Sequence, residues 1–372
     1  MEVLELSRQL LRFNTVNPPG DESACARHLG RVLEAAGFTV AAFEFAPGRT
    51  SLVARQGGSA GRAPLCFAGH LDTVPLGAAA WGFNPFGGEI ADGRLYGRGS
   101  SDMKAGVAAF VTAAIRLAGG LLGTPGLVLV ITAGEETGCD GARHLAALPG
   151  VLGEAGALVI AEPTGNHPCV GHKGALWLEG RATGVTAHGS MPERGINAIY
   201  KAARAVRALE GFDFEAAPHP ALGTPTLNVG TIAGGLNINS VPDEVILGVD
   251  IRTLPGQRHG ALRQRLTQHV GDEIAWSTLV DVEAVWTDPA DPWIQAVFDH
   301  AGPIVGARPA VRGAPYFTDA AVLTPAYGSP PTVILGPGEM ELAHQTDEYC
   351  RIDRIEQAAA LYVEIARGWC GL

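Results

Sequence analysis

Histidine and carboxylate side chains stand at the ends of several short apolar runs in this sequence, and one more carboxylate stands before an apolar segment. In chain order these residues are His70, Asp72, Asp102, Glu135, Glu136, Glu162 and His344. Imidazole and carboxylate groups without a thiolate suit zinc, with cobalt or manganese as alternatives. Two histidines and three carboxylates plus a further glutamate are too many ligands for one zinc ion. The set instead fits two divalent ions that share a bridging carboxylate.

His70 and Asp72 form a His-x-Asp pair where a predicted strand ends. Side chains at positions i and i+2 leave a strand on the same side, so Asp72 can reach the imidazole and fix its orientation. A histidine and an aspartate that merely end a strand are the alternative interpretation. Asp102 has an alternative role as well, because an aspartate before a helix is often its N-cap.

Glu135 and Glu136 follow a predicted buried strand directly. Two adjacent glutamates in such a place are costly unless a cation or a proton compensates their charge. Neighbouring side chains point apart, so each glutamate can have a different task. The pair therefore allows one metal ligand and one acid–base group.

A layered α/β domain is predicted to position these side chains. Apolar runs that end in glycine or acidic residues alternate with helical patterns, and the alanine-rich segment 103–117 has the length of a buried helix. The predicted strands span 65–68, 127–132, 158–161 and 332–335. Ligands bind at the carboxyl ends of strands in open α/β sheets, so the side chains that follow these strands should converge.

A second domain, with a different order of predicted strands and helices, begins near residue 172. Its predicted order of strand, helix, two strands, helix and strand is that of the ferredoxin-like βαββαβ unit. The predicted elements span 175–183, 197–209, 226–230, 244–252, 260–270 and 275–286. The α/β pattern then resumes with helices at 293–301 and 353–366. The expected organisation is a first domain over 1–173 and 289–372 that is interrupted by an inserted domain over 174–288.

The composition excludes several classes of partner. The chain has 372 residues, 17% of them charged, with a formal net charge of -11 and no run of lysine or arginine. Binding to nucleic acid or to an anionic membrane needs clustered cations, so neither is expected. Residues 1–15 resemble an amphipathic helix and not a secretory signal, and the apolar stretch 105–117 is too short to span a bilayer. The six cysteines are spread without a C-x-x-C pair, so we expect buried free thiols in a cytoplasmic protein.

Five segments together resemble the dinuclear-zinc family of acetylornithine deacetylase, succinyl-diaminopimelate desuccinylase, aminoacylase and glutamate carboxypeptidase. They are His70-Leu71-Asp72, the stretch 99–106, Glu135-Glu136, Glu162-Pro163-Thr164 and His344-Gln345. The resemblance covers essentially the whole chain. It implies a zinc-peptidase-like α/β catalytic domain, with a mixed sheet between helices, and an inserted α+β ferredoxin-like domain that serves as lid and dimerisation domain.

The resemblance also implies a role for each of these side chains. His70 and Glu162 would bind one zinc ion, Glu136 and His344 the other, and Asp102 would bridge the two. Asp72 would orient His70, and Glu135 would be the general base. The peptide bond between Asp102 and Met103 is expected to be cis.

The inserted domain carries a second set of residues that resemble family positions. His188 would reach into the active site of a partner subunit and stabilise the oxyanion, and Asn239 and Arg252 would hold the substrate. Arginine gives a fixed fork that suits the carboxylate of an amino acid. The alternatives are a surface histidine for His188 and an ion pair on a strand face for Arg252.

The function implied is hydrolysis of the amide bond of an N-acyl amino acid by metal-activated water, with acetylornithine-type substrates weighted highest. A dipeptidase or a glutamate-type carboxypeptidase with the same two-zinc site is the alternative, and an inert binding homologue is a further one. The resemblance implies a homodimer through the inserted domain, with hinges near 172–174 and 286–289.

Overall fold

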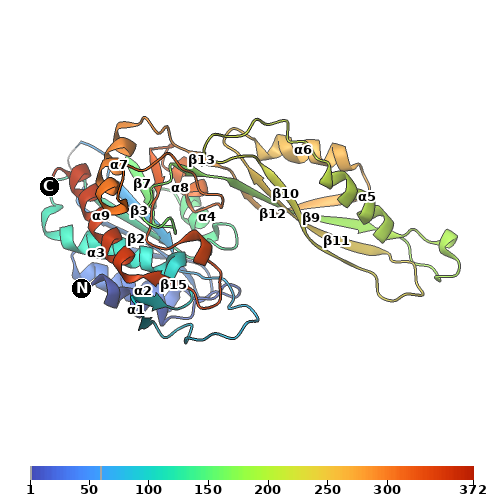
Figure 1. Cartoon of the computed structure of the whole chain (residues 1–372), viewed down its shortest axis with the longest axis horizontal. Helices are drawn as coiled ribbons and strands as arrows, with labels where there is room; N and C mark the ends of the chain where they lie inside the picture. The colour runs from blue at the N-terminus through green and yellow to red at the C-terminus, as the bar shows by residue number, and fades with distance from the viewer. Residues whose placement is uncertain (1, 59–60) are drawn as a thin grey trace. The chain divides into compact units, whose positions relative to one another are not determined.

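The computed structural model describes residues 2–58 and 61–372. Met1, where the predicted N-terminal helix would begin, lies outside the described residues. The chain forms two compact units (Figure 1). Unit 1 comprises the chain up to Gly171 together with Trp286–Ala314 and Thr318–Leu372, and unit 2 comprises His172–Val285 and Pro315–Phe317. Unit 2 is thus inserted into the sequence of unit 1.

A six-stranded mixed sheet forms the centre of unit 1, in the order β1-β2-β6-β3-β7-β14. The strands β6, β3, β7 and β14 are parallel, whereas β1 and β2 are antiparallel to their neighbours. The parallel strands coincide closely with the predicted ones. The bounds are β1 Thr39–Ala46, β2 Arg49–Gln56, β3 Leu65–His70, β6 Leu127–Thr132, β7 Ala157–Ile160 and β14 Thr332–Ile334.

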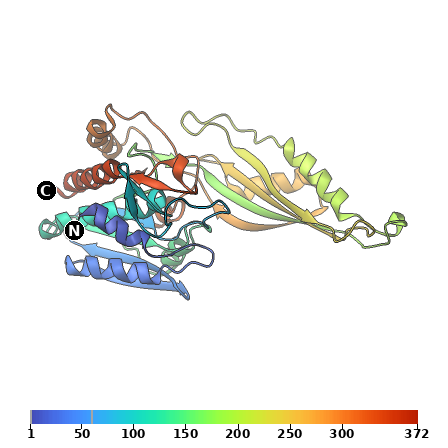
Figure 2. The same ribbon diagram turned by 60° about the horizontal axis from the view of Figure 1, so that its bottom comes forward.

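Helices cover the central strands of this sheet on both faces, since every residue of β3 is buried. Phe67 of β3 packs against Phe110 and Tyr362, with ring centroids 6.0 and 5.3 Å away. Cys66, the preceding residue, faces the hydroxyl of Tyr327. Both Figure 1 and Figure 2 show α9, drawn in red, beside α3. The helices of unit 1 are α1 Val3–Leu11, α2 Ser23–Ala35, α3 Ala105–Leu117, α4 Asp140–Ala147, α7 Pro292–Val305, α8 Ala320–Ala326 and α9 Ile352–Cys370.

The helix α3 is buried along most of its length. A Cβ atom on Gly106 would lie 2.2 Å from the carbonyl oxygen of Ala161, so glycine allows α3 to approach the end of β7 closely. The stretch Ser100–Gly120 is long and apolar enough to meet a length and composition test for membrane spans. In this fold, 72% of its most apolar window is buried inside the protein, which accounts for that composition.

Three short strands form a second sheet in unit 1, in the order β15-β5-β4. These strands are β4 Glu89–Ala91, β5 Arg94–Tyr96 and β15 Tyr349–Arg351. Sequence patterns did not predict them, because three-residue strands carry too few residues to show alternation. The sheet joins the segment after His344 to the segment before Asp102.

Unit 2 has the predicted βαββαβ order, and its four-stranded antiparallel sheet has the order β10-β11-β9-β12. Asn197 caps α5 by accepting hydrogen bonds from the backbone N–H groups of Ile199 and Tyr200. Alanine, leucine, valine and isoleucine side chains of the sheet and both helices form its core. The bounds are β9 Gly174–Thr183, α5 Ala198–Glu210, β10 Thr226–Gly234, β11 Glu244–Thr253, α6 His259–Val270 and β12 Ile274–Val282.

The predicted strand over 275–286 was wrong in one respect. Its first part is β12, but its last two residues form a separate strand, β13 Val285–Trp286. β13 pairs with β8, Gly171–His172, in a two-stranded sheet of its own. The change of pairing partner interrupts the ladder, and the alternating apolar and polar pattern of the sequence does not reveal such a change.

Unit 1 is a mixed α/β fold that is interrupted in sequence by an α+β unit, as the sequence predicted. The division of roles between 1–173, 174–288 and 289–372 stays a prediction.

Candidate metal centre

The candidate ligands leave the carboxyl ends of neighbouring parallel strands. His70 is the last residue of β3, the pair Glu135 and Glu136 follows β6, and Glu162 follows β7. His344 lies on the long connection after β14. Parallel strands end at the same edge of a sheet, so the topology alone brings these side chains together.

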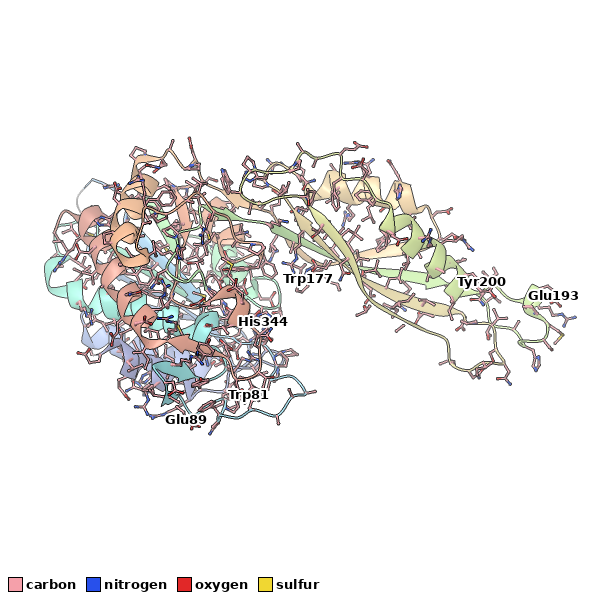
Figure 3. All side chains as sticks on the ribbon, in the orientation of Figure 1. Trp81, Glu89, Trp177, Glu193, Tyr200 and His344 are labelled. Carbon is pink, nitrogen blue, oxygen red and sulfur yellow. The ribbon has the colours of Figure 1, made fainter. Side chains whose placement is uncertain are left out.

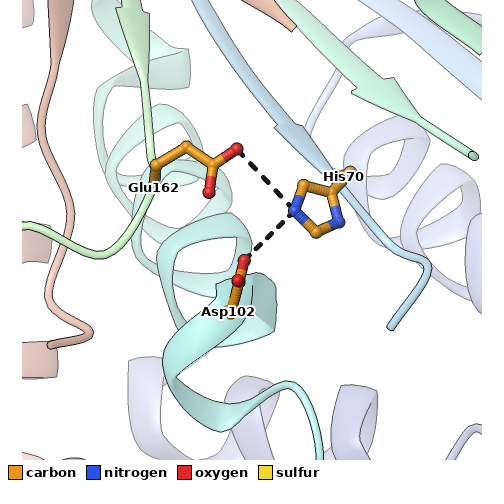
Figure 4. A group of neighbouring side chains, drawn as sticks. All are labelled: His70, Asp102 and Glu162. Carbon is orange, nitrogen blue, oxygen red and sulfur yellow. Dashed lines mark ion pairs between the residues drawn. The ribbon is translucent and has the colours of Figure 1, made fainter. Parts of the chain in front are cut away.

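The first ligand group consists of His70, Asp102 and Glu162 (Figure 4). The Nε2 atom of His70 lies 3.2 Å from Oδ1 of Asp102 and 3.7 Å from Oε1 of Glu162. The imidazole and the Glu162 side chain are almost completely buried. The three ligand atoms lie within 4.8 Å of one another.

The second ligand group consists of Asp102, Glu136 and His344. The Nε2 atom of His344 lies 3.4 Å from Oδ2 of Asp102 and 3.2 Å from Oε2 of Glu136. Half of the His344 side chain is exposed, at 51%, so this group lies nearer the surface (Figure 3). Each oxygen of Asp102 therefore faces a different histidine, which is the arrangement expected of a bridging carboxylate.

Asp102 is not the N-cap of α3. It lies in the turn Ser100–Lys104, with φ -122° and ψ 94°, and α3 begins only at Ala105. The peptide bond between Asp102 and Met103 is cis, as predicted. The capping alternative is thereby excluded, and the carboxylate is free to face the histidines.

Asp72 is completely buried and holds several groups at once. Its carboxylate accepts hydrogen bonds from the backbone N–H groups of Glu135 and Glu136, at 3.1 and 3.2 Å. Its Oδ1 lies 3.5 Å from Nδ1 of His70. Burial by itself would raise the pKa of Asp72, but the hydrogen bonds from His70 and other donors outweigh it and lower that pKa. Asp72 therefore stays ionised and aligns both glutamates with His70.

Asn17 supports Asp72 and was not found from the sequence. Its Nδ2 donates to Oδ2 of Asp72 at 3.0 Å and to the hydroxyl of Thr137 at 3.2 Å. The signal available was the Asn17-Pro18-Pro19 segment, whose two peptide bonds before proline are cis. Nothing in that segment points to an aspartate more than fifty positions away, so only the tertiary structure reveals the contact.

The site carries an excess of negative charge. Burial raises the pKa values of Glu135 and Glu162 well above the usual range, and neighbouring carboxylates add to the effect. Burial opposes the charged form of His70, yet Asp102 and Asp72 outweigh it and raise the pKa of His70. Hydrogen bonds to Asp102 and Glu136 raise the pKa of His344 to about 10. The negative charge of the clustered carboxylates favours the binding of cations in this site.

The donor set fits two divalent ions. Within the described part of the chain, Oδ1 of Asp102 and the Oε1 atoms of Glu135 and Glu136 are buried and accept no hydrogen bond. Buried carboxylate oxygens without a donor are costly unless a cation compensates them. Imidazole and carboxylate ligands in two groups that share one carboxylate suit zinc or a similar ion.

His188 and Asn239 lie together in unit 2. The backbone N–H of Gly189 donates to the carbonyl oxygen of Asn239 at 2.7 Å, and His188 forms a β-bridge with Ser240. His188 is exposed, and its Nδ1 lies 2.7 Å from the hydroxyl of Ser190. Its Nε2 thus remains available for a group outside this loop.

Arg252 lies at the other end of the unit 2 sheet. Asn239 lies five residues before β11 begins at Glu244, whereas Arg252 is the last but one residue of that strand. A strand of this length spans roughly 25 Å between such positions. Two residues labelled in Figure 3 mark the two ends of the sheet. Trp177 marks the end of Arg252, because the centre of its ring lies 5.8 Å from the Arg252 guanidinium. Glu193 marks the end of Asn239, because it lies three residues after Ser190. Asn239 and Arg252 can hold one carboxylate together only if they come from two copies of the chain.

Arg252 also has partners within its own unit. Its Nε lies 2.9 Å from Oδ1 of Asp250, and its guanidinium lies over the rings of Trp177 and Phe317. The ion pair that was the alternative interpretation is therefore present. It leaves part of the guanidinium exposed, with 24% of the side chain accessible.

Comparison with known proteins decides the family. The model of peptidase family M20/M25/M40 matches residues 66–368, which is most of the chain. The protein belongs to this family. The resemblance inferred from the five motifs is thereby confirmed.

Several curated relatives are acetylornithine deacetylases. An acetylornithine deacetylase of Vibrio atlanticus is 33% identical over 352 residues, covering 90% of this chain and 88% of the relative. An acetylornithine deacetylase of Proteus mirabilis is 31% identical and covers 99% of this chain and 96% of the relative. The similarity thus extends over both units.

Solved structures of the family share the fold. An M20 family metallo-carboxypeptidase of Sulfolobus solfataricus matches with a TM-score of 0.84 at 19% identity, and each chain is covered completely. A dinuclear metal-binding M20 peptidase of Bacillus subtilis matches with a TM-score of 0.71 at 16% identity, over 98% of this chain and 96% of the other. Membership in the M20 family makes this protein a metal-dependent amide hydrolase.

Proposed function

We propose that this M20 family member hydrolyses N-acyl amino acids of the acetylornithine type. The observation that carries the proposal is the pair of ligand groups that share Asp102, because two metal ions on one carboxylate are the arrangement used for amide hydrolysis. The identity above 30% to acetylornithine deacetylases supports the choice of substrate.

In this proposal, His70 and Glu162 would hold one divalent ion, Glu136 and His344 would hold the other, and Asp102 would contribute to both sites. Zinc is the ion that the donor set favours, with cobalt and manganese as substitutes. When bound, the two ions polarise the amide carbonyl and make a water molecule more acidic. Asp72 fixes His70 and the backbone of the two glutamates.

Glu135 acts as the general base. Its carboxylate is buried, its Oε2 lies 3.9 Å from Nε2 of His70, and burial raises its pKa, which makes it a stronger base than an exposed glutamate. Glu135 accepts the proton of the attacking water and passes it to the nitrogen of the leaving amine. The amide bond breaks, and a carboxylate and a free amine are released.

His188 and Asn239 act on the active site of a second copy of the chain. His188 donates a hydrogen bond to the oxygen on which negative charge develops, an interaction worth about 2.7 to 4 kcal/mol. Asn239 and Arg252, from different copies of the chain, hold the α-carboxylate of the substrate. The opposite positions of Asn239 and Arg252 along β11 support this division between two copies.

A homodimer through unit 2 is part of the proposal. Large apolar side chains are exposed on unit 2, which is typical of an interaction surface, and β10 is an edge strand. These side chains are Val185, Met191, Ile196, Ile199, Tyr200, Ile232, Leu236, Ile238 and Leu279. We also propose a location in the cytoplasm, since all six cysteines are free and buried.

The deciding experiment loads the purified protein with zinc or cobalt and measures hydrolysis of N-acetylornithine, N-succinyl-diaminopimelate and several dipeptides. The proposal expects the highest kcat/KM for N-acetylornithine, and loss of the activity after treatment with a chelator. A preference for dipeptides would instead support the peptidase alternative. Binding of these compounds without any hydrolysis would support an inert homologue.

A further inference from the structure

Glu348 is completely buried against the turn that carries Asp102. Its Oε1 accepts hydrogen bonds from the backbone N–H groups of Ser101 and Asp102, at 2.8 and 3.0 Å. Its Oε2 accepts hydrogen bonds from the backbone N–H of Gly99 at 2.9 Å and from Nη1 of Arg98 at 2.7 Å. An ionised carboxylate has about four lone-pair sites. All of the hydrogen bonds that the Glu348 carboxylate can accept therefore come from residues 98–102.

Arg98 is the buried counterion of Glu348, with 1% of its side chain exposed. Its Nη2 donates to the carbonyl oxygen of Pro75 at 3.1 Å, and its guanidinium lies 5.2 Å from the centre of the Trp81 ring. A buried charge that loses its partner is strongly unfavourable. The pair is thus a fixed element between three loops of unit 1.

The Asp102 turn needs support of this kind. The backbone at Asp102 is not helical, so the hydrogen bonds of α3 do not hold it. Gly99 has φ +86°, and a Cβ atom there would lie 2.6 Å from Cγ2 of Thr73, so the turn is tightly enclosed. A small rotation of this backbone would move both carboxylate oxygens of Asp102 away from His70 and His344.

We propose that Glu348 is a positioning residue that holds the backbone of the Asp102 turn and thereby keeps the Asp102 carboxylate between His70 and His344. The inference rests on the proposed metal site. Glu348 also belongs to the short segment that begins at His344, so the same contacts set the spacing between a ligand of the second group and the shared carboxylate.

The test is Glu348→Gln, which keeps the shape but places an N–H₂ group opposite backbone N–H groups or Arg98. In the metal-free protein, the amides of Ser101 and Asp102 should exchange with solvent about tenfold faster or more. Cobalt binding measured by calorimetry should weaken by about 10- to 100-fold, and the visible absorption spectrum of the cobalt protein should change.

Two controls separate positioning from general destabilisation. Asp347→Asn changes the neighbouring carboxylate, which accepts the backbone N–H groups of Gly82 and Phe83 and not those of the Asp102 turn. Leu33→Ala lowers stability by removing a core side chain of α2. Both variants should keep the cobalt affinity, the spectrum and the slow exchange at Ser101 and Asp102.

Unchanged exchange at Ser101 and Asp102, or wild-type cobalt affinity and spectrum, in folded Glu348→Gln would overturn the inference. Glu348→Asp keeps the charge with a shorter reach and should show an intermediate effect, and the same comparison applies to it if the glutamine variant does not fold. A wild-type protein that binds no cobalt would refute the proposed function. The exchange measurement on metal-free protein would still decide whether Glu348 holds the turn.

Discussion

At the scale of single residues, the two adjacent glutamates after β6 have separate surroundings. Glu136 faces His344 across 3.2 Å, whereas Glu135 lies beside His70, and its Oε1 accepts no hydrogen bond within the described chain. Asp72 holds the backbone N–H of both residues, so their side chains cannot exchange places. This division is what a ligand and a general base require.

Replacing the base tests that division. Glu135→Gln should keep two bound metal ions, because Glu135 is not one of the proposed ligands, but lower kcat by about 100-fold or more through loss of proton transfer. Steady-state kinetics and metal analysis of the same preparation measure both effects. Glu341→Gln, on the exposed part of the connection before His344, is the matched control and should keep full activity. Normal turnover by Glu135→Gln would remove Glu135 from the base role.

At the scale of elements, the close approach of α3 to β7 places the Asp102 turn opposite the end of that strand. The contact depends on Gly106, where a Cβ atom would meet the carbonyl oxygen of Ala161 at 2.2 Å. Ala161 directly precedes Glu162, so the same contact sets the distance between two ligands of the first group.

Gly106→Ala should therefore destabilise the protein by about 1–3 kcal/mol, the usual cost of overpacking, although alanine is the better helix former. Urea denaturation gives the change in free energy of unfolding. Gly119→Ala is the control, since nothing lies within 4 Å of its added Cβ, and it should change stability by less than about 0.5 kcal/mol. Equal effects of the two substitutions would show that the approach of α3 is not tight.

At the scale of the whole molecule, the proposed site would need a second copy of the chain to be complete. Asn239 and His188 lie at one end of unit 2, and Arg252 lies at the other, so the second set of predicted residues does not converge within one chain. A dimer resolves this separation if each copy lends His188 and Asn239 to the other.

Mixing two inactive variants tests whether each copy of the chain supplies His188 to the active site of the other. Glu135→Gln lacks the base, and His188→Ala lacks the oxyanion donor, but a mixed dimer would contain one site with both groups. Random mixing should restore about a quarter of wild-type activity, because half of the dimers are mixed and each has one intact site. Activity of separately purified and co-refolded variants measures this. Absence of any recovery in verified mixed dimers would place His188 in the site of its own chain.

The sequence predicted much of the fold for identifiable reasons. Strands such as 127–132 are continuous apolar runs with clear ends, and the residues after them had to lie at one edge of the sheet. The prediction of one strand over 275–286 was partly wrong, because a change of pairing partner at residues 283–284 does not alter the pattern of apolar residues that predicts a strand. The roles of the site residues stay predictions.

The sequence by itself determined which chemical groups are available and, through the order of strands, that His70, Glu136 and Glu162 would gather at one edge. Local patterns carry that information because hydrophobic burial and strand direction depend on neighbouring residues. Only the tertiary structure decided that Asp102 faces two histidines and does not cap α3, and that Asn17, Arg98 and Glu348 support the site. The contacts of Asn17 with Asp72 and of Arg98 with Glu348 join residues more than fifty positions apart, and a hydrogen bond across such a separation depends on the packing of whole elements.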